Sequence, residues 1–314
     1  MRVLIFGSSG QLGQALRLTV IRDTEVTYAS HSDCDISNQQ AVKKLMDAVE
    51  PDFVINCAAY TAVDRAEEEV EHCYRINALA PQIIAKCCSR VQTRRLIHIS
   101  TDFVFDGAKK TPYNEEDTPN PVSVYGASKL MGENKILAEI PNQAMIIRTA
   151  WVYHAIGSNF VNTMLRLMSQ RNELNIVDDQ KGSPTFARSL AQLIWDLIHE
   201  GRFLPGIYHW TDAGEITWYE FAESIYEEAT RYGLLSQPVV INPITTSEYP
   251  TLAIRPSYSV LGGEKMERLI NRKRSFWRDN LQLFCEELRL SLIHISEPTR
   301  RRGISYAVFC LKKK

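Results

Sequence analysis

A glycine-rich loop that directly follows a hydrophobic run at the N-terminus constrains this fold most. Residues 2–6, Arg-Val-Leu-Ile-Phe, have the length and composition of a buried parallel strand. Residues 7–13, Gly-Ser-Ser-Gly-Gln-Leu-Gly, come next, and apolar residues then recur with helical spacing. A strand, a glycine turn and a helix in this order are typical of a dinucleotide-binding unit, in which the N–H groups at the helix start bind a pyrophosphate.

The three glycines of this loop have different expected roles. Gly7 takes up the backbone angles of a tight turn, and Gly10 lets the backbone approach the phosphates without a side chain. Gly13 lets the helix pack closely on the strand. The other predicted cofactor contacts in the loop are Ser9, Gln11 and Leu12.

Strand-like runs alternate with amphipathic stretches in the first half of the chain. The expected strands are 25–29, 53–59, 96–100 and 145–148, and the expected helices are 38–49, 67–89 and 126–139. This order predicts an α/β fold with a Rossmann-type, doubly wound parallel sheet. Ligands bind such sheets at the carboxyl ends of the strands. We therefore expect one crevice to hold the glycine loop, the cofactor-contacting residues Ala58, Ala59 and Tyr60, and the run Ser100-Thr101-Asp102.

The pattern becomes less regular after about residue 150. Helices are expected at 160–167 and 218–232, and strands near 174–178, 207–211 and 238–244. The sequence thus predicts a dinucleotide-binding domain over residues 1–150, to which some later segments return. A smaller α/β substrate-binding portion is expected over residues 151–289.

Composition excludes several classes of protein. The 314 residues are 45% hydrophobic and carry a formal net charge of −1, which suits a large core and gives no basic excess for binding nucleic acid. The seven cysteines show no metal-ligand spacing, and this favours a reducing compartment. No apolar run approaches the roughly 20 residues of a membrane span, and a core strand occupies the place of a signal peptide. We therefore expect a cytoplasmic protein that binds no membrane.

The run Tyr-Gly-Ala-Ser-Lys at residues 125–129 predicts proton-transfer chemistry. Tyr125 and Lys129 are four residues apart and so share one face of a helix. A free phenol has a pKa of about 10, which a nearby ammonium lowers, and the same lysine can hydrogen-bond the nicotinamide ribose. The Thr101 hydroxyl is expected to polarise a substrate carbonyl while Tyr125 supplies the proton. With the glycine loop, these residues predict a nicotinamide-dependent oxidoreductase.

Longer motifs run along nearly the whole chain, from residue 1 to about 289. The most informative occupy residues 56–64, 100–107, 125–133, 148–153, 159–160, 163–167, 179–185, 249–251 and 255–256. In this order they resemble the extended short-chain dehydrogenase/reductases, and within them the dTDP-4-dehydrorhamnose reductases. The resemblance implies reduction of the C4 ketone of dTDP-4-dehydro-β-L-rhamnose, the last step in making an activated sugar for cell-surface polysaccharide. Thr101, Tyr125 and Lys129 fall on the family's catalytic positions.

The resemblance also implies a set of substrate-binding residues. Trp151 falls where the family has a tryptophan near the sugar, and a flat indole suits the apolar side of a pyranose ring. Arg255 is expected to grip the diphosphate of the nucleotide sugar with two hydrogen bonds. Asp102, Asn159 and Phe160 complete this set.

The cofactor is predicted less directly. An acidic residue at the end of the second strand would favour NAD, but Asp33 comes late after that strand. We therefore expect NADPH, with NADH usable. By resemblance, Asp35 and Ile36 border the adenine. A magnesium ion is implied by the resemblance alone, because no ligand cluster in the sequence requires it.

The C-terminal tail departs from the family. Residues 290–300, Leu-Ser-Leu-Ile-His-Ile-Ser-Glu-Pro-Thr-Arg, match the translation of a common transposase-type sequencing adapter, and residues 304–311 match its flow-cell end. We therefore predict that residues 290–314 are non-native and carry no function.

Two alternatives stay open. A non-catalytic relative resembling the regulatory subunit of methionine adenosyltransferase would keep the glycine loop and the Tyr-Lys pair. Another nucleotide-sugar reductase or an epimerase would use the same pair. Dehydratase chemistry is disfavoured, because Phe103 replaces the second acid expected after Asp102. A homodimer is compatible with the sequence, whose helical periodicity does not specify an oligomeric state.

Overall fold

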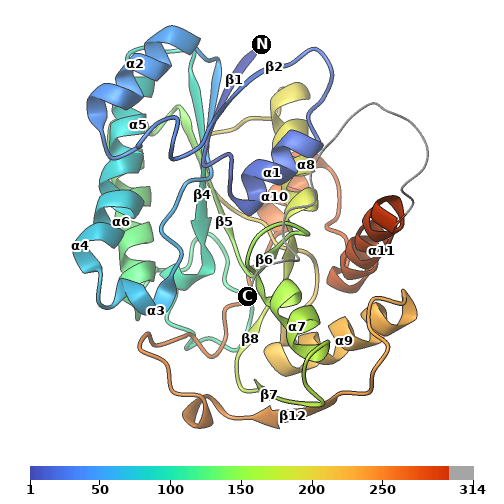
Figure 1. Cartoon of the computed structure of the whole chain (residues 1–314). Helices are drawn as coiled ribbons and strands as arrows, with labels where there is room; N and C mark the ends of the chain where they lie inside the picture. The colour runs from blue at the N-terminus through green and yellow to red at the C-terminus, as the bar shows by residue number, and fades with distance from the viewer. Residues whose placement is uncertain (297–314) are drawn as a thin grey trace.

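A parallel sheet of six strands forms the centre of the computed structural model (Figure 1), in the order β10-β5-β4-β3-β1-β2. The strands are β1 (Arg2–Phe6), β2 (Glu25–Ala29), β3 (Phe53–Asn56), β4 (Arg95–Thr101), β5 (Ala144–Thr149) and β10 (Gly206–His209). The structure describes the backbone of residues 1–296 and the side chains of residues 1–290. The chain builds outward in one direction from β1 to β2 and in the other from β3 to β5. This confirms the predicted Rossmann-type sheet and places its topological switch point between β1 and β3.

Helices cover both faces of this sheet (Figure 1). Alternate residues of β1 point to opposite faces, as a strand requires: Val3 and Ile5 enter one core, and Leu4 and Phe6 enter the other. The first core is shared with α1 (Gln11–Leu18), α8 (Ala187–His199) and α10 (Glu264–Ile270). The second is shared with α2 (Gln39–Val49), α5 (Ala80–Cys88) and α6 (Val124–Glu139).

The helix expected over residues 67–89 is interrupted, which corrects the sequence prediction. It consists of α4 (Val70–Tyr74), a π-helical turn η1 (Arg75–Leu79) and α5. A short helix, α3 (Val63–Ala66), precedes it. Pro81 lacks an N–H group, so the regular hydrogen bond to the carbonyl four residues earlier, that of Asn77, cannot form. The wider turn therefore occurs just before the proline.

The second half of the chain forms a further hydrophobic cluster and also returns to the main sheet. The cluster joins α7 (Phe160–Met168), β7 (Glu173–Val177), α9 (Trp218–Arg231) and α11 (Trp277–Ser296), with β12 (Val240–Ile244) paired to β7. The short strands are β6 (Val152–Tyr153), β8 (Lys181–Gly182), β9 (Thr185–Phe186) and β11 (Ile216–Thr217). Because β10, α8 and α10 pack on the main sheet, the domain boundary near residue 150 stays a prediction.

The tail that we predict to be non-native begins at Leu290, within α11, and its residues 297–314 lie outside the described part of the chain. Its origin therefore stays a prediction. Over residues 1–296, no helix has the length and apolar character needed to cross a membrane.

A buried ion pair fixes the position of α6 against the sheet. Arg148 on β5 donates from Nη2 to Glu133 Oε2 at 2.6 Å and from Nε to Glu133 Oε1 at 3.0 Å. Ser100 on β4 donates to the same Oε1 at 2.5 Å. The Arg148 and Glu133 side chains are only 2% and 1% exposed. One carboxylate therefore joins α6 to two adjacent strands.

We expect Glu133→Gln to lower the free energy of unfolding by about 3–5 kcal/mol, because it leaves the buried Arg148 charge without a charged partner. Urea unfolding measures the change. The matched control is Asp47→Asn, which breaks the exposed Lys43–Asp47 pair and should leave the free energy of unfolding nearly unchanged, because exposed pairs contribute little. Equal losses in the two variants would show that the buried pair adds nothing specific.

Candidate active site

The glycine loop lies against the residues that follow β3, at the switch point of the sheet. Gly7 has a φ of +76°, and a Cβ atom there would lie 2.5 Å from the backbone nitrogen of Ala58. A Cβ atom on Gly13 would lie 2.5 Å from the carbonyl oxygen of Gly7. Both positions therefore require glycine, one for its backbone angles and both for close approach.

The start of α1 offers unpaired donors to an anion. Its N-cap residue, Gly10, provides no side-chain cap, and no acidic residue lies in the first turn. Across the described residues, no backbone or side-chain acceptor binds the N–H groups of residues 11–13. Such a helix start suits a pyrophosphate. The residues present thus fit the phosphates of a dinucleotide.

The remaining predicted cofactor residues are placed in different ways. Ser9 and Gly10 are exposed at the loop, whereas the Leu12 side chain packs in the core. Ile36 is also a core residue, only 5% exposed. Asp35 accepts hydrogen bonds from the N–H and hydroxyl groups of Ser37. The adenine contacts of Asp35 and Ile36 stay predictions.

The loop after β3 is held by a residue that the sequence did not single out, Asn77 on the π-helical turn. Its Oδ1 accepts from Tyr60 N at 2.8 Å, and its Nδ2 donates to Tyr60 O at 3.0 Å and to Ser128 Oγ at 3.1 Å. The Tyr60 hydroxyl itself donates to Glu69 at 2.8 Å. Asn77 therefore ties the predicted cofactor loop to α6. The local sequence feature that marks the π-helical turn, and with it the place of Asn77, is Pro81.

Thr101, Tyr125 and Lys129 are brought together and buried where β4 ends. They are 5%, 9% and 2% exposed. Ser123 caps α6 by accepting a hydrogen bond from Gly126 N at 3.2 Å, which places Tyr125 in the first turn. Thr101 Oγ1 donates to Asp102 Oδ1 at 3.0 Å.

Burial controls the protonation of this group. It raises the pKa of Tyr125, and the nearby Thr101 hydroxyl only partly opposes the rise. It lowers the pKa of Lys129 to about 8, against the opposing charge of Glu133. Burial also raises the pKa of Asp102 to about 6, while Ser259 and Thr101 favour its charged form.

The expectation that Lys129 lowers the pKa of Tyr125 is wrong for this structure. The loss of hydration on burial raises the pKa of the phenol more than the nearby Thr101 hydroxyl lowers it. Lys129 Nζ instead donates to the carbonyl oxygen of Ile99 at 2.7 Å.

Trp151 lies in an aromatic stack. Its φ is +47°, an uncommon value for a residue other than glycine. Its ring is parallel to that of Trp218, with centroids 3.4 Å apart and an interplanar angle of 11°. A Cβ atom on Gly182 would lie 2.5 Å from the same indole. Trp218 therefore covers a flat face of the Trp151 indole, the kind of surface predicted to contact the sugar.

Two other predicted substrate residues support the structure of this region. Asn159 caps α7 by accepting from Asn162 N at 2.9 Å, and its amide donates to Gln11 Oε1 at 2.9 Å and to the carbonyl oxygen of His154 at 2.8 Å. Phe160 packs against Trp218, with ring centroids 4.5 Å apart. The Asn159 contact joins the glycine loop to the second half of the chain.

Arg255 is paired with a carboxylate. Its Nη1 and Nη2 donate to Asp64 Oδ1 and Oδ2 at 3.0 and 2.7 Å. The structure thus places this predicted diphosphate ligand beside α3.

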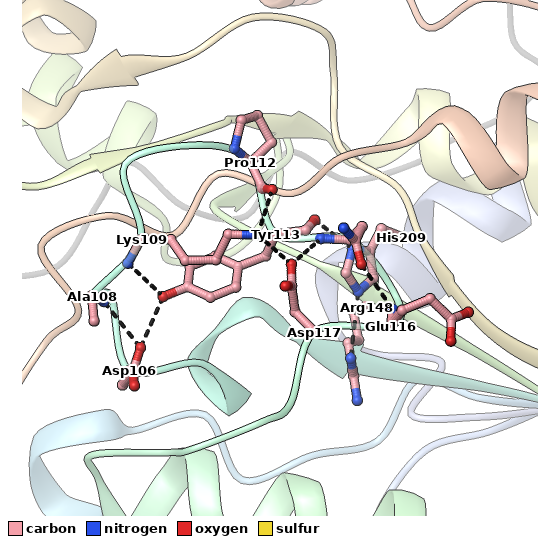
Figure 2. A network of polar contacts seen from close by, with 10 residues as sticks. Asp106, Ala108, Lys109, Pro112, Tyr113, Glu116, Asp117, Arg148 and His209 are labelled. Atoms are coloured by element: carbon pink, nitrogen blue, oxygen red, sulfur yellow. Dashed lines mark hydrogen bonds and ion pairs between the residues drawn. The ribbon is translucent and has the colours of Figure 1, made fainter.

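A polar network fixes the loop that follows β4 (Figure 2). The Tyr113 hydroxyl donates to Asp106 at 2.9 Å, and Lys109 Nζ pairs with Asp117 at 2.6 Å. His209 on β10 contacts the Tyr113 carbonyl oxygen at 3.1 Å through Nδ1 and Arg148 through Nε2 at 3.5 Å. The loop is thereby connected to the buried ion pair.

The residues that the structure describes include no group of three or more His, Cys, Asp or Glu side chains placed to hold a metal ion. The magnesium ion implied by resemblance therefore has no support from the structure.

Comparison with known proteins identifies the family. The family model described as the RmlD substrate binding domain matches residues 1–290. A dTDP-4-dehydrorhamnose reductase of Aggregatibacter actinomycetemcomitans is 38% identical over 294 residues, which cover 91% of this chain and 99% of the relative. The chain belongs to the dTDP-4-dehydrorhamnose reductase family. The family match ends at residue 290, where the tail predicted to be non-native begins.

Solved structures of this reductase family have the same fold. A dTDP-4-dehydrorhamnose reductase of Clostridium acetobutylicum is 39% identical, with a TM-score of 0.85 over 92% of this chain and 100% of that chain. A Bacillus anthracis dTDP-4-dehydrorhamnose reductase in complex with NADP is 36% identical, with a TM-score of 0.85 over 91% of this chain and 99% of that chain.

The lowered pKa of Lys129 predicts how stability depends on pH. Between its folded pKa of about 8 and its ordinary value of 10.5, the unfolded chain binds the extra proton. The free energy of unfolding contributed by this group therefore rises as pH increases through that window. Lys129→Met should remove this contribution, so that the difference in stability between wild type and variant changes from pH 7 to pH 10.

Urea unfolding at a series of pH values measures this difference. Lys43→Met, which removes an exposed lysine on α2, is the control and should track the wild type. A Lys129→Met profile parallel to that of the wild type would contradict the assignment of a lowered pKa.

Proposed function

We propose that this protein reduces the C4 ketone of dTDP-4-dehydro-β-L-rhamnose to dTDP-β-L-rhamnose, with NADPH as the hydride donor. The observation that carries the proposal is the burial of Thr101, Tyr125 and Lys129 together at the end of β4, in a sheet whose switch point holds the glycine loop. The substrate follows from the reductases to which the chain is similar. The NADP in the Bacillus anthracis relative supports the choice of cofactor.

The chain's own residues would hold the cofactor at its phosphates and at its ribose. The free N–H groups of residues 11–13 would bind the pyrophosphate. Lys129 would hydrogen-bond the nicotinamide ribose. A cofactor held in this way would supply the hydride that the ketone carbon accepts.

Tyr125 would donate the proton that the ketone oxygen requires. Its raised pKa keeps the phenol protonated at neutral pH, which suits a general acid. The Thr101 hydroxyl can donate only one hydrogen bond, and in this structure it donates that bond to Asp102. To polarise the ketone, Thr101 must redirect that hydrogen bond from Asp102 to the substrate oxygen.

The second half of the chain would supply most of the substrate side. We assign Arg255 to the diphosphate and Trp151 to the sugar, the latter requiring Trp218 to move from the indole face that it covers. Phe160 and Asn159 would shape the substrate site around Trp151. Asp102 would act on the substrate indirectly, through its hydrogen bond with Thr101.

Tyr125→Phe should lower kcat by about 10²–10⁴, the usual contribution of a positioned general acid, and leave NADPH affinity unchanged. The loss of NADPH absorbance on adding the 4-dehydro sugar nucleotide measures kcat, and fluorescence titration measures NADPH binding. Tyr226→Phe, which removes a phenol hydroxyl on α9, is the matched control and should keep wild-type activity.

A wild-type protein that binds NADPH but oxidises none with this sugar nucleotide would contradict the proposed reaction. That result would favour the non-catalytic alternative resembling a methionine adenosyltransferase regulatory subunit.

NADPH should be preferred to NADH by about tenfold or more in kcat/KM, since one hydrogen bond to a charged group contributes about 1.5–3 kcal/mol. After β2, Asp33 turns back and accepts from Ser30 N at 2.9 Å and from Ser30 Oγ at 2.6 Å. His31 and Ser32, which are exposed, would then face the 2′-phosphate. Steady-state rates with the two cofactors measure the ratio, and a preference for NADH would contradict this assignment.

A further inference from the structure

An ion pair between Asp64 and Arg255 joins two segments that lie 191 residues apart in the chain. Asp64 is on α3, which closely follows the predicted cofactor loop, and Arg255 lies beyond η3 (Thr246–Glu248). Besides the two guanidinium contacts, the backbone N–H of Ala253 donates to Asp64 Oδ1 at 3.2 Å. Arg255 Nη1 also donates to the carbonyl oxygen of Ala253 at 3.3 Å. The guanidinium is therefore held from more than one direction.

The segment that carries Arg255 runs along the predicted active site. Figure 1 shows the chain after β12 passing below α3, and the hydrogen bonds agree with this view. Ser257 donates from its hydroxyl to the Gly107 carbonyl oxygen at 3.2 Å, and its own carbonyl oxygen accepts from Lys181 N at 2.8 Å. Ser259 lies close enough to Asp102 to influence its pKa. Arg255 thus lies between α3 and the loop that follows β4.

The hydrogen bonds of Arg255 leave one edge of its guanidinium free. A guanidinium has five N–H donors, and Asp64 and Ala253 accept three of them. Among the described side chains and backbone, no acceptor is found for Nε or for the second hydrogen of Nη2. These two N–H groups lie side by side, in the geometry that binds a carboxylate or phosphate with two hydrogen bonds.

Stability alone is a weak explanation for this pair. The Arg255 and Asp64 side chains are 25% and 40% exposed, and pairs with such exposure contribute little to folding. The hydrogen bonds from Arg255 lower the pKa of Asp64, which therefore stays ionised at neutral pH. A charged carboxylate that takes two N–H groups of an arginine fixes the plane of the guanidinium as well as its position.

We propose that Asp64 is a positioning residue, which orients Arg255 so that the free Nε–Nη2 edge binds the diphosphate of the nucleotide-sugar substrate. This inference rests on the proposed function, in which Arg255 is the diphosphate ligand. The opposite role, in which Asp64 competes with the diphosphate for Arg255, would need the substrate to displace the carboxylate. The free edge makes that displacement unnecessary.

Asp64→Asn tests the inference, because it keeps the size of the side chain and removes its charge and one acceptor oxygen. We expect the KM for the nucleotide sugar to rise about tenfold, equivalent to about 1.4 kcal/mol, with kcat within about twofold of wild type. Calorimetric titration with dTDP alone should show a similar loss of affinity. NADPH affinity should be unchanged. Glu68→Gln, which removes an exposed carboxylate four residues further along the chain, is the charge-matched control and should behave as wild type.

A double-mutant cycle separates positioning from a general effect of charge. In an Arg255→Met background, Asp64→Asn should have no further effect on dTDP affinity, because the group that it orients is gone. A full effect in that background would overturn the inference. So would tighter dTDP binding by the Asp64→Asn single variant, which is the signature of competition.

The failure of the proposed function gives a different result. If the wild-type protein binds dTDP but does not reduce the 4-dehydro sugar, the reaction is wrong, and the dTDP titrations still test the role of Asp64. If the wild-type protein reduces the sugar and Arg255→Met leaves KM unchanged, the reaction stands and the inference about Asp64 fails.

Discussion

Glu133 and Arg148 pair inside the protein, where neither side chain is more than 2% exposed, and the geometry of the candidate site depends on this contact. Glu133 is four residues beyond Lys129 on α6, and it also accepts a hydrogen bond from Ser100, the neighbour of Thr101. The spacing between β4, which ends at Thr101, and α6, which carries Tyr125 and Lys129, is therefore set by one carboxylate. Through His209, Arg148 also contacts the network that holds the loop after β4 (Figure 2).

Much of the fold could be predicted from the sequence because its signals are local. The strand expected at 25–29 has those bounds in the structure, and the glycine turn has the positive φ and the close contacts that the motif requires. α8 and α10 were not predicted. Both pack on the main sheet beside elements distant in the chain, and the interruption of the 67–89 helix follows from a missing N–H group at Pro81.

The candidate site was predicted in part, for a related reason. Residue types at fixed spacing indicated Thr101, Tyr125 and Lys129, which the structure brings together, but spacing carries no information on desolvation. The direction of the Tyr125 pKa shift was therefore predicted wrongly. Asn77 and Asp64 were missed because their partners are distant in sequence: Ser128 for one and Arg255 for the other. Stacking of Trp218 on Trp151 is likewise a contact between distant segments.

The π-helical turn over residues 75–79 has a consequence for how this helix tolerates changes in length. A π turn closes its hydrogen bond over one more residue than an α turn. Deleting one residue from this turn would therefore return it to the α-helical spacing, with only the bond at Pro81 still missing, while the flanking helices, α4 and α5, keep their places. The Asn77 side chain would rotate away from Tyr60 and Ser128, which it now joins. The extra residue of the turn therefore serves the alignment of the cofactor loop through Asn77. The packing of α5 on the sheet does not depend on it, so a change in the length of the turn would affect the loop before it affects the fold.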